Sequence, residues 1–257
     1  PPVIRVEYIA GLSFARGVTA CWRDGPDGLA LTDELKAFGP MYAMNADQLR
    51  SSYYASQGDL ARAELHRKRV EMQAVKLGSS WQVETWAPAD ATKTALRTND
   101  ALIMKRAAQE LARLSREIPS LELEERHARG PYLVLRGKYA HALALLDTDE
   151  EPLAIVGWAR TRGTLARAYN GLGQHEKARE TCLDVLARLT PEDLQYPVMN
   201  LNVSIEFALA EAGLGNFALA QQQLDALIAL HGPNQGPLTL GALHEARARV
   251  ALASGEL

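Results

Sequence analysis

The pattern of apolar and polar positions repeats along the chain. Segments 51–63, 166–178 and 208–220 each contain a helix-like stretch, then a glycine, then an alanine five residues after that glycine. A glycine or asparagine of this kind, here called a turn residue, recurs at spacings of 33, 41, 38, 36, 42 and 40 residues, at Gly25, Gly58, Asn99, Gly137, Gly173, Gly215 and Gly255. Self-similarity with a period of roughly 20 to 50 residues indicates a repeat architecture.

Helix physics explains the residue types in this pattern. A helix often ends at a residue with left-handed backbone, which glycine and asparagine adopt most easily. A small residue suits a place where two antiparallel helices approach closely, and the position five residues after each turn is Ala30, Ala63, Ala142, Ala178 or Ala220, with Met104 as the exception. We therefore expect a single array over residues 1–257, made of about seven helix–turn–helix units.

Composition favours the same all-α fold. The chain has 41 alanines and 38 leucines, together 79 of 257 residues, while valine and isoleucine together number only 19. Alanine and leucine are strong helix formers, and a large sheet would need more β-branched residues. The 28 Lys and Arg residues nearly balance the 31 Asp and Glu residues, so the whole-chain charge predicts neither nucleic acid nor an anionic membrane as a partner.

The chain shows no signs of secretion or membrane insertion in its sequence. No apolar run approaches the roughly 18 to 20 residues needed to cross a bilayer, and no secretory leader is visible. Its two cysteines, Cys21 and Cys182, form neither a disulfide framework nor a zinc site. We expect a cytoplasmic, reducing location. Because the sequence begins with Pro1 and Pro2 rather than Met, we also expect a fragment of a longer polypeptide.

The repeat resembles the tetratricopeptide repeat (TPR), a helix–turn–helix unit of about 34 residues. The residues that match the signature places of that family are Leu165, Ala166, Tyr169, Gly173, Ala178 and Pro191. This resemblance implies a right-handed α-solenoid of about seven TPR-like units. The fourth unit departs most, because Gly130-Pro131 falls inside its first helix, where we expect a kink or an early break.

A narrower resemblance concerns segments 20–29, 53–65 and 242–255. They are similar to the C-terminal tails of bacterial serine/threonine protein kinases of the eukaryotic-like type, in which a kinase domain and often an ATPase-like region precede the repeats. The resemblance implies a regulatory or partner-recruiting region. Its partner would be another protein, a peptide, or the kinase or ATPase part of the same polypeptide.

Catalytic motifs are missing from the sequence. It has no phosphate-binding glycine-rich loop, no His-Arg-Asp and no Asp-Phe-Gly. His175-Glu176 and His244-Glu245 begin like a zinc-protease motif, but the residues four after each histidine are Arg179 and Ala248. We therefore expect no enzymatic activity, no cofactor and no metal in this chain.

Several residues admit two interpretations. The run from His66 to Arg69 is either a phosphate-contacting patch or a solvated helix face, and interleaved Glu64 and Glu71 favour the second. The tryptophans at positions 22, 81, 86 and 158 are either core anchors or ligand cages, and we favour core anchors. His127 has no partner at a recognisable spacing.

The TPR resemblance implies that ligands bind along the first helices of the units. The 35 corresponding positions hold six Lys or Arg and two Glu, an excess of four positive charges that favours an acidic peptide. The candidates are Asn45, Gln48, Trp86, Lys93, Arg97, Arg160, Arg167, Asn170, Asn202 and Arg249. The same places include His127, Gly171 and Gly213. The carboxylate clamp of chaperone-binding TPR proteins is not present, because its basic or Asn places hold Asp90, Thr164 and Glu206.

Three functions follow from these observations. The first is a non-enzymatic scaffold that binds a protein or peptide in a largely preformed groove, with Arg160 and Arg167 at its centre. Reversing both charges is expected to abolish binding without loss of helix. The second is a sensor that closes around a peptide or metabolite, and the third is a spacer that associates with copies of itself.

Overall fold

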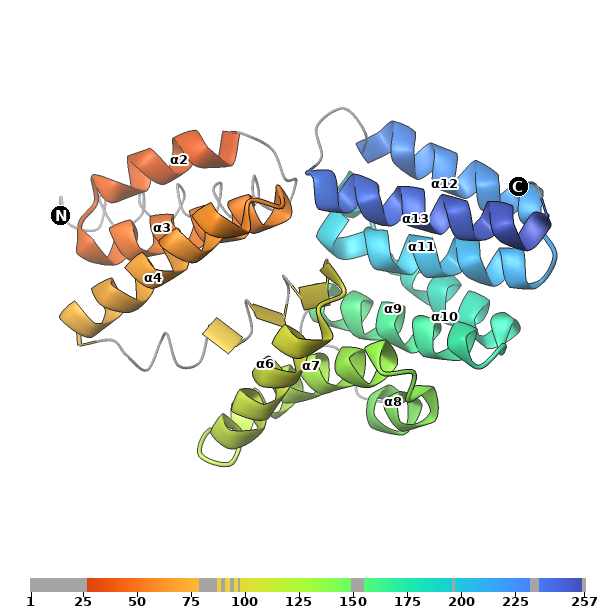
Figure 1. Cartoon of the computed structure of the whole chain (residues 1–257), viewed down its shortest axis with the longest axis horizontal. Helices are drawn as coiled ribbons and strands as arrows, with labels where there is room; N and C mark the ends of the chain where they lie inside the picture. The colour runs from red at the N-terminus through yellow and green to blue at the C-terminus, as the bar shows by residue number, and fades with distance from the viewer. Residues whose placement is uncertain are drawn as a thin grey trace. The chain divides into compact units, whose positions relative to one another are not determined.

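A computed structural model describes residues 27–78, 87–88, 91–92, 95–96, 98–148, 155–195, 197–231 and 236–255. Within these ranges the regular structure is entirely helical, as the composition predicts. The longer helices are α2 (Asp27–Lys36), α3 (Pro40–Ser56), α4 (Leu60–Lys76), α6 (Ala101–Leu114), α7 (Glu122–Leu135), α8 (Tyr139–Leu146), α9 (Ile155–Gly171), α10 (His175–Arg188), α11 (Pro197–Gly213), α12 (Phe217–His231) and α13 (Pro237–Ser254) (Figure 1). Two 3-10 helices, η1 (Pro119–Leu121) and η2 (Asp193–Gln195), precede α7 and α11.

The chain divides into two compact units. Among the residues described, the first unit holds α2, α3, α4 and residues 236–238. The second unit holds α6 to α12 and α13 from residue 239 onwards. The single array over residues 1–257 stays a prediction.

The turns share one capping geometry. Five glycine turn residues have left-handed φ between 67° and 86°, and Asn99 has a φ of 52°. The residue after the turn donates its backbone N–H to a carbonyl five residues earlier, at 2.9 Å from Asp59, Lys138, Gln174 and Asn216 and at 3.0 Å from Asp100. This is the Schellman arrangement, which satisfies carbonyls at the end of a helix. Gly25 lies outside the described residues.

Four of the five alanines that lie five positions after a turn are buried as predicted, and Met104, the exception to the small-residue pattern, is buried too. Met104 and the alanines of four units, Ala63, Ala142, Ala178 and Ala220, are buried. The prediction is wrong at Ala30, which is exposed. The helix expected to pack against Ala30, before Gly25, lies outside the described residues.

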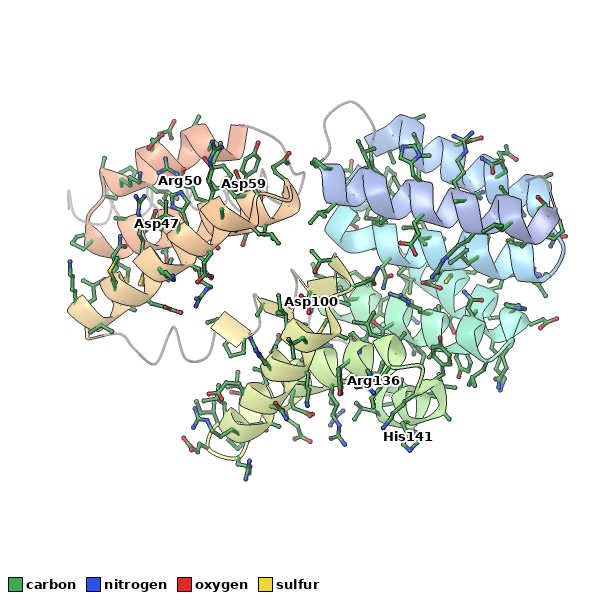
Figure 2. The ribbon with its side chains drawn as sticks, viewed as in Figure 1. Asp47, Arg50, Asp59, Asp100, Arg136 and His141 are labelled. Carbon is green, nitrogen blue, oxygen red and sulfur yellow. The ribbon has the colours of Figure 1, made fainter. Side chains whose placement is uncertain are left out.

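In the first compact unit, α3 packs against both α2 and α4. Between α3 and α4, Oδ1 of Asp47 (Figure 2) lies 2.8 Å from His66 Nδ1, and the ring of Tyr54 stacks on His66. His66 is therefore buried, and the run from 66 to 69 does not form one charged face. Arg67, by contrast, lies on the surface and pairs with Glu64 at 2.6 Å, as the solvated-face interpretation predicts.

In the second compact unit, α9 lies at the centre and packs against α7, α8, α10 and α11. Trp158 is buried in its main core cluster with Leu165 and Val203, which confirms the core interpretation for this tryptophan. The other three tryptophans lie outside the described residues. Cys182 is in the same cluster, and burial raises the pKa of its thiol, with a smaller contribution from Glu206.

The first helix of the fourth repeat unit is not broken. Helix α7 runs through Gly130 and Pro131 to Leu135, so the expectation of an early break is wrong. Proline has no N–H to donate to the carbonyl four residues before it, yet the helix continues through Pro131 to Leu135. A Cβ at Gly130 would lie 2.6 Å from the side chain of Leu146, so glycine lets α8 pack closely against α7.

Candidate functional site

Most of the predicted groove residues that the structure describes lie in the second compact unit. Arg160, Arg167 and Asn170 lie on α9, Asn202 lies on α11 and Arg249 lies on α13. Asn45 and Gln48 lie half-buried on α3 in the first unit. Trp86, Lys93 and Arg97 lie outside the described residues. Helix α9 packs against both α7 and α11, so first helices of neighbouring units lie side by side and bring several of these candidates together.

Arg167 and Asn170 both face Glu206 on α11. Asn170 Nδ2 donates to Glu206 Oε2 at 3.0 Å and to the Glu206 carbonyl at 2.9 Å. Arg167 Nε lies 3.8 Å from Glu206 Oε1, and Arg167 Nη1 donates to Asn99 Oδ1 at 3.1 Å. These contacts tie α9 to α11 and to the turn before α6.

Glu206 is 4% exposed. Burial raises the pKa of its carboxyl, and Arg167, Asn170 and Arg249 act in the opposite direction. The Glu206 carboxyl therefore contacts Arg167 and Asn170, two of the predicted groove residues. The charge count over the 35 groove positions did not include Glu206, because it lies one residue beyond a counted position. The surrounding stretch 201–212 is otherwise largely apolar.

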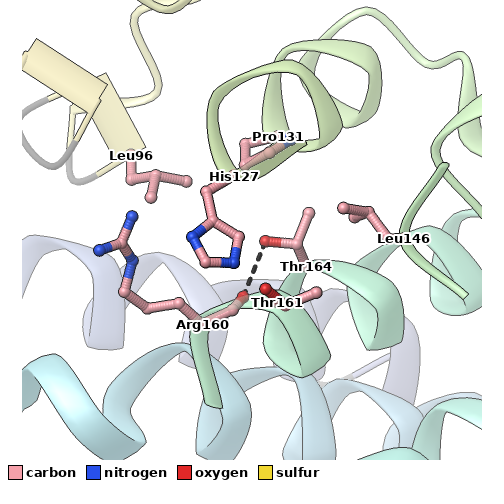
Figure 3. A pocket seen from close by; sticks show the side chains of 7 residues that line it. All are labelled: Leu96, His127, Pro131, Leu146, Arg160, Thr161 and Thr164. Carbon is pink, nitrogen blue, oxygen red and sulfur yellow. Dashed lines mark hydrogen bonds between the residues drawn. The ribbon is translucent and has the colours of Figure 1, made fainter. Parts of the chain in front are cut away.

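A second cluster lies between α7 and α9, where a small pocket opens. Its lining residues are Leu96, His127, Pro131, Leu146, Arg160, Thr161 and Thr164 (Figure 3). His127 is 7% exposed, and its Nδ1 has no hydrogen-bond partner within the described part of the chain. Glu124 Oε2 lies 4.0 Å from His127 Nδ1, which is beyond hydrogen-bond distance.

Electrostatics keep the His127 ring neutral. Burial lowers the pKa of His127 to about 4, and the positive charges of Arg160 and Arg126 contribute. The two threonine hydroxyls bond to backbone carbonyls, Thr164 to Arg160 at 3.0 Å and Thr161 to Gly157 at 3.0 Å. The pocket thus combines one cationic side chain, one neutral imidazole and apolar walls. The TPR resemblance put both His127 and Arg160 among the groove positions, but sequence spacing could not show that they share a pocket, because they lie on different helices.

Comparison with models of known protein families gives no match, and no curated protein matches the chain. The interpretation of these clusters therefore depends on their geometry.

Two predicted groove positions serve packing. A Cβ at Gly171 would lie 2.4 Å from the Tyr139 ring, and a Cβ at Gly213 would lie 2.4 Å from the His175 ring. His175 Nδ1 also lies 3.2 Å from Asn170 Oδ1. In both cases an aromatic ring at the start of one repeat unit's second helix (α8 or α10) contacts the glycine that ends the first helix of the following repeat unit (α9 or α11).

Asn202 also faces a glycine. A Cβ at Gly163 would lie 2.8 Å from Asn202 Nδ2, so α9 and α11 are in close contact there. Arg249 is exposed and pairs with Glu245 at 3.3 Å. Within the part of the chain that the structure describes, no three His, Cys, Asp or Glu residues form a metal-binding group. Nor is any helix there both long and apolar enough to cross a membrane.

Proposed function

We propose that the chain is a non-enzymatic scaffold that binds a peptide or protein segment along the first helices of a right-handed solenoid of about seven TPR-like units. The observation that carries this proposal is the lateral packing of α7, α9 and α11, with the same capping geometry after α7, α9 and α11. Stacked units of this kind create an extended surface from their first helices. A preformed surface loses little conformational entropy when a partner binds.

The resemblance to kinase tails suggests where such a scaffold acts. We propose that it recruits a partner to a serine/threonine kinase on the same polypeptide or restrains that kinase. In either case the scaffold would bind an acidic segment, because Arg160 is the groove arginine whose side chain lines a pocket. Arg167 faces the carboxyl of Glu206.

The test is selection of binding peptides from a displayed library on the immobilised chain. Selected peptides should lose binding to Arg160→Glu and keep binding to Arg136→Glu, a matched charge reversal at an exposed residue in the α7–α8 turn. Arg167→Glu is unsuitable, because it would place a second carboxylate beside buried Glu206 and disturb the fold. Far-UV circular dichroism of both variants should match the native chain.

The alternatives give different results in the same preparations. If no peptide is enriched and sedimentation shows mass that rises with concentration, the chain is a self-associating spacer and the proposal fails. If a metabolite extract compacts the chain in small-angle scattering while no peptide binds, the sensor function replaces it. Equal peptide binding by the Arg160→Glu variant would keep the scaffold and move its binding surface away from α9.

A further inference from the structure

We propose that two copies of this chain associate through helix α4, which would lie parallel to α4 of the second copy. The contact surface is a stripe along α4, made of Ala61, Leu65, Lys68, Met72 and Val75. A two-fold contact of this kind closes at two copies. The inference goes beyond the proposed function, because the contact needs no peptide, and a scaffold made of two copies would still bind one.

The stripe is exposed although most of its residues are apolar. Leu65, Met72 and Val75 are 49%, 57% and 72% exposed. The five stripe positions follow one another at intervals of four, three, four and three residues, which places them along one face of the helix. Helix α4 packs against α3, and its buried residues, which include Ala63 and His66, lie outside the stripe. Contiguous exposed apolar surface of this kind marks an interaction site.

Charged residues border the stripe on both sides, with one sign on each side. Glu64 and Glu71 each precede a stripe residue and form an acidic border. The residues that each follow a stripe residue form a basic border, made of Arg62, Arg69 and Lys76. The three basic residues are exposed, and the two glutamate side chains are 45% and 40% exposed. In a coiled-coil heptad, the stripe would occupy positions a and d, the acidic border position g and the basic border position e.

The two borders select a second copy in parallel orientation as the occupant. In a parallel pair of helices, each g residue faces the e residue of the following heptad in its partner. Glu64 would therefore face Arg69 of the second copy, and Glu71 would face Lys76 of the second copy. An antiparallel pair would bring g beside g and e beside e, so that like charges would repel. Both glutamates also pair with Arg67 on their own helix, but ion pairs this exposed are weak and can exchange partners.

Lys68 interrupts the stripe and limits the strength of the contact. Its Nζ lies 3.7 Å from Glu64 Oε1, so the ammonium is directed to the acidic border while the methylene groups cover the stripe. A lysine in the seam between two helices fixes their register at a cost in stability. The stripe is also short, so we expect a weak dimer with a dissociation constant on the order of tens of micromolar.

Sedimentation equilibrium of the complete chain tests the association at concentrations from about 5 to 500 μM, which bracket the expected affinity. We expect the mass to rise from that of a monomer to that of a dimer and no further. Leu65→Asp should weaken association about tenfold or more, because it places two carboxylates in the seam. Leu183→Asp is the matched control, since Leu183 is 42% exposed on α10, outside the stripe. Far-UV circular dichroism of both variants should match the native chain.

Two further sets of variants leave the apolar residues in place. Lys68→Leu should strengthen the dimer about tenfold or more, because it completes the seam. Replacing Glu64 and Glu71 with lysine makes both borders basic, and replacing Arg69 and Lys76 with glutamate makes both borders acidic. Each of these double variants alone should associate more weakly than the native chain, while an equimolar mixture of the two should form the mixed dimer.

Cysteine cross-linking tests the parallel orientation. Val75→Cys is made in a chain that also carries Cys21→Ser, while Cys182 is buried and therefore inert. In the parallel dimer the two introduced cysteines lie opposite each other, within reach of a disulfide. In an antiparallel dimer they would lie near opposite ends of the helix pair, about 20 Å apart. We expect the disulfide to form at the concentrations at which sedimentation shows the dimer.

The dimer is refuted if the native chain stays monomeric throughout, as it would if another part of the same chain or a different protein covered the stripe. It is also refuted if the mass rises beyond that of a dimer, or if Leu65→Asp weakens association no more than Leu183→Asp. Unchanged affinity in Lys68→Leu, or no cross-link in Val75→Cys, would overturn it as well. None of these outcomes bears on the scaffold, because peptide selection does not require the dimer.

Discussion

Replacing Gly171 with alanine tests the ring-on-glycine packing between neighbouring units. Gly171 ends α9, and the Tyr139 ring lies where a Cβ would be placed, with ring atoms at 2.4 to 2.6 Å. Contacts this short cannot persist, so either the ring or the helix must move. In an open helical site, the same change would instead stabilise the protein by up to about 1 kcal/mol.

The expected magnitude comes from the two opposing effects. Forcing an extra methyl group into a packed contact usually costs about 1–3 kcal/mol, and the propensity gain offsets about 1 kcal/mol at most. We expect Gly171→Ala to lower the free energy of unfolding by about 1–2 kcal/mol. Gly241 on α13 is the matched control, because nothing lies within 4 Å of its Cβ position. Gly241→Ala should be stabilising.

Urea denaturation followed by circular dichroism measures both changes. A double-mutant cycle with Tyr139→Ala then isolates the contact, because without the ring Gly171→Ala should be neutral or stabilising. The reasoning is wrong if Gly171→Ala stabilises the chain as much as Gly241→Ala, or if its cost is the same with and without the Tyr139 ring.

Three further predictions concern the buried polar groups and the turns. The pKa of His127 is lowered from 6.5 to about 4 in the folded chain, so the unfolded chain binds more protons between these values and stability falls as pH drops through that window, by about 2 kcal/mol at pH 5. Urea titrations at pH 7.5 and 5.0 should show this loss, and His127→Gln should show a smaller one. Glu206→Ala should cost about 1–3 kcal/mol, because it removes the buried carboxyl that accepts from Asn170 and lies beside Arg167. Glu206→Gln should cost less, since its amide oxygen still accepts from Asn170, and equal costs in thermal denaturation would argue against that contact. Asn99→Ala should destabilise by about 1–2 kcal/mol, because alanine adopts left-handed backbone poorly, and Asn99→Gly should cost less unless the bond to Arg167 matters more than the backbone.

The local features of the fold could be predicted from sequence, because each depends on residues close together in the chain. Gly137 and Gly173 end helices because a helix end needs a residue with left-handed backbone, and Asn99 adopts the same backbone conformation. The early break expected at Gly130-Pro131 was wrong, because α7 continues through both residues to Leu135. The local rule for proline also contains no information about the contact of Leu146 with Gly130, which joins two helices.

The candidate site was harder to predict than the turns. Arg160, Arg167 and Asn170 were found as candidates, because helical spacing places them along one helix. Glu206 and His127 were also noted at or beside the TPR ligand places, but their pairing with these residues was not predicted, since they come from α11 and α7. The pairing depends on how neighbouring units stack, and a charge count along one helix face treats each residue as though it faced solvent.

The equivalence of the turns bears on how this chain can change length. The ring of Tyr139 on Gly171 and the ring of His175 on Gly213 are the same contact one unit apart, and each ring lies two residues after a capping glycine. Deleting residues 138–173 would join Gly137 to Gln174, recreate the turn sequence Gly-Gln-His, and leave the contact of His175 with Gly213 intact. Recombination between turns would therefore keep this ring-on-glycine contact, while α10 would take the place of α8 against α7. Such an event would delete Arg160 with α9, while His127 on α7 would remain.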